Sequence, residues 1–210
     1  MSETHHEGIQ PDTELSLPAR RALAIHELLV EKGIIGLDEV RERAEMFHSR
    51  RPSDGARVVA RAWSDPDFKR RLLEDARSAV YELGYTLTRD AELAVVENTE
   101  SVHHLVVCTL CSCYPTSLLG PPPDWYKSFA YRQRAVVGPR SVMREFGLEL
   151  SDDMQVRVVD STADLRYLVL PRRPKGADGM SEDELAALVT RDSMIGVSEP
   201  LRPKRENPVL

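Results

Sequence analysis

All three cysteines of this 210-residue chain lie within six positions, as Cys108, Cys111 and Cys113. They follow the apolar run 105–107 and precede Tyr114. Two cysteines at i and i+3 bring both sulfurs to one side of a tight loop, and the third, at i+5, adds another donor. Because thiolates are soft donors, such a cluster selects borderline or soft metals. The spacing therefore predicts a metal site, and the fold has to hold this loop.

The residues around the cluster leave its coordination incomplete. Three thiolates do not fill a tetrahedral zinc site, and the sequence has no second cysteine pair. His103 and His104 are close, but they belong to an apolar run typical of a strand, so only one of them would face the cysteines. Either the backbone or another chain must complete the site. Deprotonated amides at Ser112 suit a metal that prefers square-planar or octahedral nitrogen and sulfur donors.

Three other interpretations of the cysteines are open. A disulfide is disfavoured, because three is an odd count and cysteines so close in sequence rarely form a bridge. Disulfides are also rare in intracellular proteins. Ordinary buried cysteines would not cluster in this way. A zinc or iron–sulfur site is the third alternative, although both usually have four protein ligands.

The segment 107–115 (VCTLCSCYP) resembles the metal-binding signature of the nitrile hydratase alpha subunit. Thr109 resembles the cobalt-containing branch, since the iron-containing branch typically has serine there. The gamma subunit of thiocyanate hydrolase is related and shares the motif. The resemblance extends from about Pro18 to Val197 and includes three further segments, 60–66 (ARAWSDP), 119–127 (LGPPPDWYK) and 190–197 (TRDSMIGV).

This resemblance implies one low-spin, non-corrin Co(III) ion, Co(3+), per chain. Its ligands would be the sulfurs of Cys108, Cys111 and Cys113 and the backbone nitrogens of Ser112 and Cys113. In the family pattern Cys108 would be an unmodified axial thiolate, Cys111 a cysteine sulfinic acid and Cys113 a cysteine sulfenic acid, which are successive steps of thiol oxidation. The sixth position would hold water, hydroxide or substrate.

The reaction that the resemblance implies is the hydration of a nitrile to an amide by a lyase. The metal would act as a Lewis acid on the nitrile nitrogen. The nucleophile would be either a metal-activated water or the sulfenate oxygen of Cys113, and the sequence does not choose between them. The catalytic residues implied are Cys113, Cys111 and Ser112.

The resemblance also implies a hetero-oligomer with a tightly bound beta subunit, present as one chain or split into two. Two arginines of that partner would hydrogen-bond the oxidised sulfurs, so the isolated chain should be poorly active. An activator chaperone is expected for cobalt loading. Asp160 and Asp164 match family acidic positions that orient partner histidines, although exposed carboxylates at a strand end are an equal alternative.

Two departures from the family pattern bear on the substrate. Thr116, followed by Ser117, stands where the family usually has tryptophan, and Arg89 where it usually has glutamine. Loss of the indole predicts a roomier, more polar pocket, suited to a bulky nitrile such as the nucleoside toyocamycin. Alternatively, Arg89 binds an anion and the chain is the cobalt-containing subunit of a thiocyanate hydrolase. A non-catalytic metal-carrying or interaction protein is the alternative from another class.

Composition and charge indicate a single domain with tails. The hydrophobic content of 41% suffices for a core, and 28 basic against 34 acidic residues argue against nucleic-acid binding. No apolar run approaches membrane-spanning length, and the N-terminus lacks the apolar region of a signal peptide. With clustered, reduced cysteines, a cytoplasmic location is expected.

The N-terminal part of the chain has helical spacing. Pro18 suits the first turn of a helix that Gly33 ends, and a second helix is expected over 37–48. The two helices share little apolar surface, so they should form an arm that packs on a partner subunit. Four parts are therefore predicted: a disordered N-terminal tail 1–17, a helical arm 18–54, a metal-binding catalytic domain 55–198 and a C-terminal tail 199–210.

The catalytic domain should combine helices and strands, which predicts an α+β fold. The expected architecture is a helical N-terminal arm followed by a small layered α-β-α domain with the metal-binding cysteine loop at the edge of its sheet. Trp125 and Tyr126 should anchor the exit of that loop. Strands are expected over 93–96, 103–107, 156–159 and 167–170. Helices are expected over 55–63, from a Ser64 cap to 83, over 139–146, and after a capping box of Ser181 and Glu184.

Overall fold

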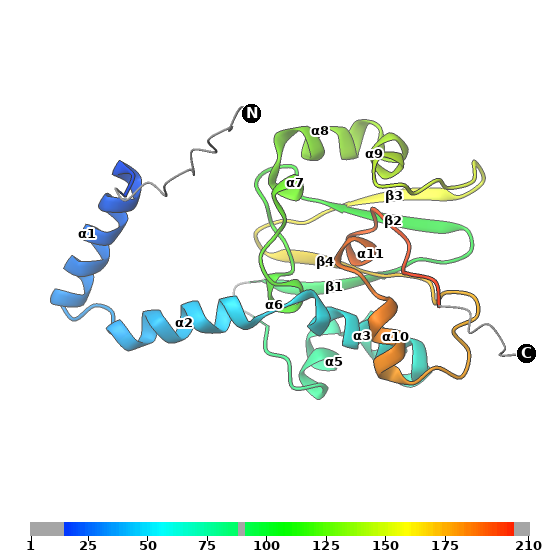
Figure 1. The fold of residues 1–210 in the computed structure, drawn as a ribbon, viewed down its shortest axis with the longest axis horizontal. Helices are drawn as coiled ribbons and strands as arrows, with labels where there is room; N and C mark the ends of the chain where they lie inside the picture. The colour runs from blue at the N-terminus through cyan, green and yellow to red at the C-terminus, as the bar shows by residue number, and fades with distance from the viewer. Residues whose placement is uncertain (1–14, 88–90, 204–210) are drawn as a thin grey trace, which may run out of the picture. The chain divides into compact units, whose positions relative to one another are not determined.

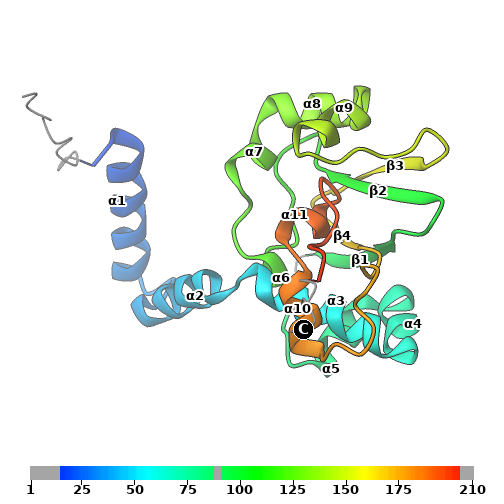
Figure 2. The ribbon, with the colours of Figure 1, turned by 45° about the vertical axis from the view of Figure 1, so that its right-hand side comes forward.

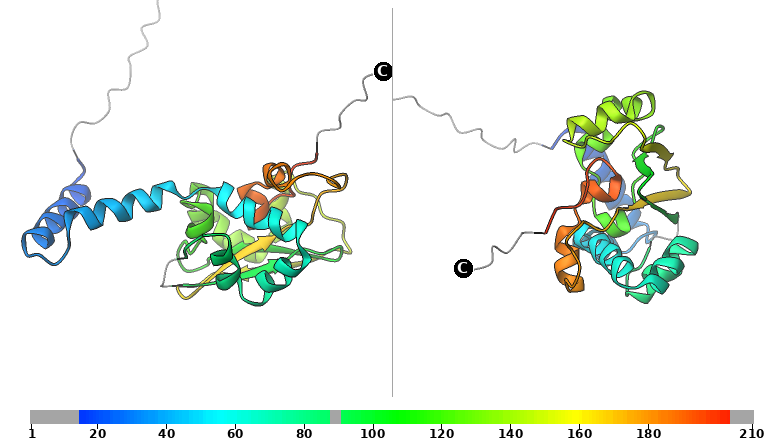
Figure 3. Two further views of the ribbon diagram at one scale, coloured as in Figure 1. Left: turned by 90° about the horizontal axis from the view of Figure 1, so that it is seen from below. Right: turned by 90° about the vertical axis from the view of Figure 1, so that its right-hand side faces the viewer.

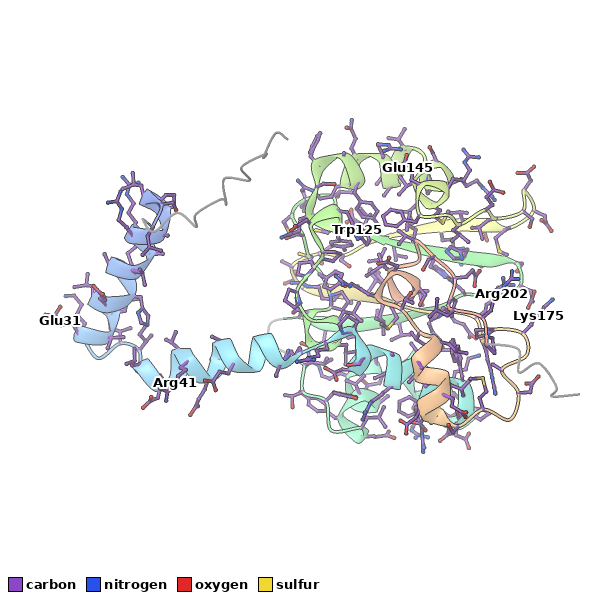
Figure 4. The ribbon with its side chains drawn as sticks, viewed as in Figure 1. Glu31, Arg41, Trp125, Glu145, Lys175 and Arg202 are labelled. Atoms are coloured by element: carbon purple, nitrogen blue, oxygen red, sulfur yellow. The ribbon has the colours of Figure 1, made fainter. Side chains whose placement is uncertain are left out.

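The computed structural model describes residues 15–87 and 91–203 and divides the chain into two compact units after Glu45. The first unit holds α1 (Leu17–Glu31) and most of α2 (Leu37–Ser49), so both predicted helices are confirmed. The Ser16 hydroxyl caps α1 by accepting a backbone N–H at 3.4 Å. No residue of α1 is buried, and Figure 4 labels one charged residue on each helix, Glu31 on α1 and Arg41 on α2.

The second unit begins with three consecutive helices, and the prediction of one helix from a Ser64 cap to residue 83 is wrong. Ser64 is the last residue of the first of these helices, where its hydroxyl donates to the Ala60 carbonyl at 2.9 Å. Asp65 caps the next helix, and Asp75 ends it and caps the third. Aspartate carboxylates compete with helix-interior hydrogen bonds and therefore favour caps. The helices are α3 (Pro52–Ser64), α4 (Pro66–Glu74) and α5 (Ala76–Glu82).

Within residues 15–87 and 91–203, four strands form two parallel pairs, as Figure 1 shows, and confirm the four predicted strands. β1 (Glu92–Glu97) pairs with β4 (Leu165–Leu170), and β2 (Val102–Val107) pairs with β3 (Gln155–Asp160). Parallel strands need long crossover connections, which here contain helices. Because β2 and β3 are parallel, their carboxyl ends meet at one edge.

Helices cover both pairs of strands (Figures 1 and 2). α8 (Phe129–Val137) and α9 (Pro139–Glu145) pack on β2 and β3, whereas α4 and α5 pack on β1. α11 (Arg191–Ile195) lies against β2 and β4. Figure 3 gives two further views of these layers. The arrangement confirms the predicted α+β fold of layered helices and strands.

Some helices of the second unit lie outside the predicted set. α6 (Thr116–Leu119), α7 (Asp124–Lys127) and α11 have five residues or fewer, so a helical period of apolar residues cannot show in their sequence. α8 is longer, but it buries only Tyr131 and Ala135. The predicted capping box of Ser181 and Glu184 is confirmed at the start of α10 (Glu182–Leu188).

A close approach of two backbone segments fixes α11 against β2. Gly196 follows α11 with φ 88°, and a Cβ atom there would lie 1.9 Å from the His104 carbonyl oxygen. Glycine is therefore the residue that this junction requires. The large side chains that fill the core of this unit include Phe68, Leu72, Leu105, Leu118, Tyr126, Met143 and Met194.

The boundaries predicted after residues 17, 54 and 198 stay predictions. Residues 1–14 and 204–210, which hold most of the predicted tails, lie outside the described residues. In the described part, the Leu201 N–H donates to the Leu188 carbonyl oxygen at 2.8 Å. Among the described helices, none is long and apolar enough to cross a membrane.

Candidate metal centre

The cysteine loop begins directly at the carboxyl end of β2. In the parallel pair, Val107 lies opposite Asp160, the last residue of β3. The Ser161 N–H donates to the Val107 carbonyl at 2.7 Å, so the pairing continues to the residue before Cys108. The rigid end of a strand pair therefore sets where the chain enters the loop.

The structure brings the three cysteine sulfurs together. Cys108 and Cys113 are buried, Cys111 is exposed, and none of them forms a disulfide. The Cys111 sulfur lies 3.4 Å from that of Cys108 and 3.0 Å from that of Cys113, whereas a disulfide bond is about 2.05 Å long. All three sulfurs lie within 4.8 Å of one another, so one ion can contact all of them.

The sulfur separations bear on the geometry of such an ion. Two sulfurs bonded to one ion at about 2.3 Å lie about 3.3 Å apart when the angle between the bonds is 90°, and about 3.8 Å apart when it is tetrahedral. The observed separations of 3.0 and 3.4 Å are closer to the first value. These two sulfur pairs are therefore spaced more like neighbouring ligands at 90° than like two ligands of tetrahedral zinc.

The thiols of the loop differ in acidity. The Cys113 and Cys108 thiols, aided by the backbone N–H groups of Ser112 and Cys113, lower the pKa of Cys111 to about 7. Burial, reinforced by the two neighbouring thiols, raises the pKa of Cys113 to about 12, and the charge of Arg166 opposes that rise. The exposed Cys111 is therefore the more readily ionised and the more reactive of these two thiols.

Hydrogen bonds from other elements hold the loop at both ends. Both carboxylate oxygens of Asp160 accept from Thr109, one from its N–H at 2.9 Å and the other from its hydroxyl at 2.6 Å. At the exit, the hydroxyl of the fully buried Tyr126 donates to the Cys113 carbonyl at 2.8 Å. The Tyr131 hydroxyl donates to a carbonyl of β2 at 2.6 Å. Tyr126 thus has the anchoring position expected of it.

The two histidines near the loop serve the fold instead. His103 Nε2 lies 2.8 Å from the Gly196 carbonyl oxygen, and its Nδ1 lies 3.1 Å from the Asn98 amide nitrogen. The His104 N–H donates to the Asn98 side-chain oxygen at 2.7 Å. Burial lowers the pKa of both imidazoles. Among the described residues, the group that could hold an ion contains the three cysteines and neither histidine.

A cavity of about 300 Å³ opens beside the loop. The predicted pocket residue Thr116 lines it, whereas Arg89 lies outside the described residues. Asp164 is in the turn before β4, where its N–H donates to the Thr162 hydroxyl. The residues lining the cavity include Cys111, Ser112, Cys113, Tyr114, Pro115, Thr116, Ser117, Leu118, Arg166, Leu87 and Leu93.

Arg166 also lines the cavity, although no motif in the sequence predicts it as a site residue. Its Nη1 is buried and has no hydrogen-bond partner among the described residues, although the side chain lines the cavity together with Cys113. A buried guanidinium nitrogen without an acceptor is costly, so a ligand or another chain is the natural source of one. The signal in the sequence is a lone charged residue near the start of the apolar strand β4.

The fold and the loop define an α+β protein in which three clustered thiols that could hold a metal ion lie beside a cavity. Comparison with known proteins specifies the family. The model of the family described as "Nitrile hydratase, alpha chain" matches residues 16–198. The chain therefore belongs to the nitrile hydratase alpha-chain family, as the resemblance predicted.

The similar proteins include both nitrile hydratase alpha subunits and a thiocyanate hydrolase gamma subunit. The chain is 50% identical to the low-molecular weight cobalt-containing nitrile hydratase subunit alpha of Rhodococcus rhodochrous, over 89% of this chain and 91% of that one. It is 42% identical to the thiocyanate hydrolase subunit gamma of Thiobacillus thioparus, over 85% and 78% of the two chains. A solved recombinant thiocyanate hydrolase with partially modified cobalt centres has a TM-score of 0.85 at 40% identity, covering 94% of this chain and 97% of that chain.

Proposed function

We propose that this chain carries the catalytic Co(III) of a nitrile hydratase and hydrates a nitrile to the amide together with a partner subunit. The observation that carries the proposal is the convergence of three free thiols, with sulfur separations of 3.0 and 3.4 Å, beside an open cavity. The 50% identity to a relative named as cobalt-containing supports the choice of metal.

The ligands would be the sulfurs of Cys108, Cys111 and Cys113 with the backbone nitrogens of Ser112 and Cys113, for one ion per chain. A bound cobalt ion would supply Lewis-acid polarisation of the nitrile. Cys111 would become the sulfinic acid, which is consistent with its exposure and its pKa of about 7. Cys113, which lines the cavity, would become the sulfenic acid, and the buried Cys108 would stay unmodified.

A beta subunit, as one chain or two, would cover the loop and bind the N-terminal helices. Leu110, within the loop, is 84% exposed, and Phe129, at the start of α8, is 71% exposed. α1 separately exposes Leu23, Ile25 and Leu28. Large apolar side chains exposed in this way are typical of surfaces that a partner buries. Because Cys108 is fully buried, an activator chaperone would load the metal. The free thiols favour a cytoplasmic location.

The substrate proposed is a bulky or polar nitrile, such as the nucleoside nitrile toyocamycin. The absence of an indole at Thr116 and the presence of Arg166 in the cavity support this choice. The variant Thr116→Trp should reduce turnover of large nitriles more than turnover of acrylonitrile. Equal losses on both would rule the roomier pocket out.

Thiocyanate hydrolysis is the second candidate, and Arg166 favours it. The side chain of Arg166 lines the cavity with Cys113 and suits an anion, because its buried Nη1 lacks an acceptor among the described residues. Thiocyanate and an organic nitrile assayed on the same assembled complex separate the two activities. If Arg166 binds the anion, Arg166→Gln should abolish thiocyanate hydrolysis and leave hydration of the organic nitrile measurable.

The experiment that tests the proposal is amide formation by the cobalt-loaded complex of this chain with its partner. Cys113→Ala should abolish turnover, and the surface variant Asp178→Asn should keep it. A non-catalytic metal-carrying or interaction protein predicts instead that cobalt moves between complexes and that no complex turns over a nitrile or thiocyanate.

A further inference from the structure

We propose that Asp160 is a positioning residue that holds the cysteine loop through Thr109 and thereby sets how firmly the loop retains cobalt. The inference rests on the cobalt site proposed above. It concerns the part of the loop between Cys108 and Cys111, where the exposed sulfur and the exposed Leu110 lie.

The two residues form a two-point hydrogen bond. One carboxylate oxygen of Asp160 accepts the Thr109 N–H at 2.9 Å, and the other accepts the Thr109 hydroxyl at 2.6 Å. The Thr109 carbonyl also accepts from Arg132 Nη1 at 3.4 Å. Every polar group of Thr109 is therefore bound, and hydrogen bonds to a charged acceptor are the stronger kind.

Asp160 can act as an anchor because β3 fixes its backbone. It ends the strand opposite Val107, and the Ser161 N–H continues the pairing. The carboxylate thus reaches the loop from a second strand, 51 residues further along the chain than Thr109. Fixing Thr109 in this way removes conformational freedom from the segment that must place the Cys111 sulfur.

The other cysteines depend less on this contact. Cys108 is fully buried next to β2, and Cys113 is buried with its carbonyl held by Tyr126. Cys111 is exposed and contacts the protein chiefly through the two other sulfurs. Loss of the Asp160–Thr109 contact should therefore loosen the Cys111 side of the donor set most.

Chelator challenge of the cobalt-loaded complex tests this proposal. The rate of cobalt loss is measured by metal analysis, and the cobalt–sulfur absorption bands report the ligand geometry. Asp160→Ala should speed cobalt loss roughly tenfold to a hundredfold, the range typical when outer contacts of metal ligands are removed. Asp160→Asn, which keeps one acceptor oxygen, should give a smaller effect, and the surface control Asp178→Asn should give none.

Changes at Thr109 separate positioning from a general loss of structure. Thr109→Ser keeps the hydroxyl and should behave like the wild type, whereas Thr109→Val should approach Asp160→Asn. If the two residues act as a pair, the effect of Asp160→Ala with Thr109→Val will be smaller than the sum of the single effects. Unchanged far-ultraviolet circular dichroism in Asp160→Asn and Thr109→Val shows that the fold persists.

Two different results would contradict the positioning role of Asp160, and only one of them would also overturn the proposed cobalt site. If the wild type retains cobalt and Asp160→Ala retains it equally well, or if the two changes are additive, the positioning role is wrong and the cobalt site stands. If the wild-type complex takes up no cobalt, both the proposed function and this inference are overturned.

Discussion

The helices of the two units are stabilised in different ways. In the first unit, α1 has fifteen residues and buries none of them, and its Leu23, Ile25 and Leu28 are about half exposed. In the second unit, the shorter α4 buries Phe68 and Leu72 almost completely. Isolated helices of about fifteen residues are marginal in water, so α1 gains little stability from packing. The metal loop, by contrast, lies in a unit with its own core.

The largest effect is expected at the junction that closes the second unit. Gly196→Ala should lower the free energy of unfolding by at least about 3 kcal/mol, because its Cβ would overlap the His104 carbonyl oxygen. Gly176 also has a positive φ, of 83°, but a Cβ atom added there would have no other atom within 4 Å. Gly176→Ala should therefore cost only the backbone strain, about 1–2 kcal/mol. Equal losses in urea unfolding would contradict this account of the α11 junction.

A matched pair of leucines tests the comparison of the two units directly. Leu72→Ala should destabilise the chain by about 2–5 kcal/mol, because it opens a cavity in the core. Leu28→Ala in α1 should stay within about 0.5 kcal/mol in the chain alone, since that side chain is half exposed. It should instead weaken binding of the partner subunit, measured by calorimetric titration. A large stability loss for Leu28→Ala would show that α1 buries this side chain within the chain itself.

Two buried tyrosines separate the stability of the fold from that of the loop. Tyr126→Phe leaves the Cys113 carbonyl without its donor, and Tyr131→Phe does the same to a carbonyl of β2. Each should cost about 1–3 kcal/mol of unfolding free energy. Only Tyr126→Phe should also speed cobalt loss to a chelator. Equal cobalt retention in both variants would mean that the exit of the loop needs no anchor.

The smallest effect is a pH dependence of the second unit. Burial lowers the pKa of His103 and His104 in the folded chain, so the unfolded chain binds protons first as the pH falls below about 6.5. Stability should therefore decrease with falling pH, by at most about 1.4 kcal/mol per pH unit for each histidine. Thermal unfolding between pH 7.5 and 5.5 measures the slope, which His103→Gln should reduce. If His103→Gln has the same slope as the wild type, the pH dependence of stability comes from other groups.

Local signals in the sequence predicted much of the fold. Local interactions between neighbouring residues decide three of these features, which are the β-rich runs, the capping box at Ser181 and the glycine after α1. They could therefore be predicted from the sequence. The break at Asp75 was missed because the apolar period continues across it, although its carboxylate caps α5. Four-residue helices such as α6 carry no period that a sequence can show.

In the candidate site, too, the residues close together in the sequence were predictable, and those that only the fold brings together were not. The clustered thiols were predictable because all three donors lie within six residues. The contacts of Thr109 with Asp160 and the position of Arg166 in the cavity join segments about fifty residues apart, and only the parallel pairing of strands brings them together. A charged residue in an apolar strand, such as Arg166 in β4, indicates a functional position, but the sequence does not predict which cavity its side chain reaches.

Metal analysis combined with intact-mass spectrometry tests the central claim most directly, on this chain purified with its partner. The account predicts about one cobalt ion per chain, and a mass increase of about three oxygen atoms located on Cys111 and Cys113. Zinc or no metal, with all three cysteines unoxidised in the assembled complex, would contradict it.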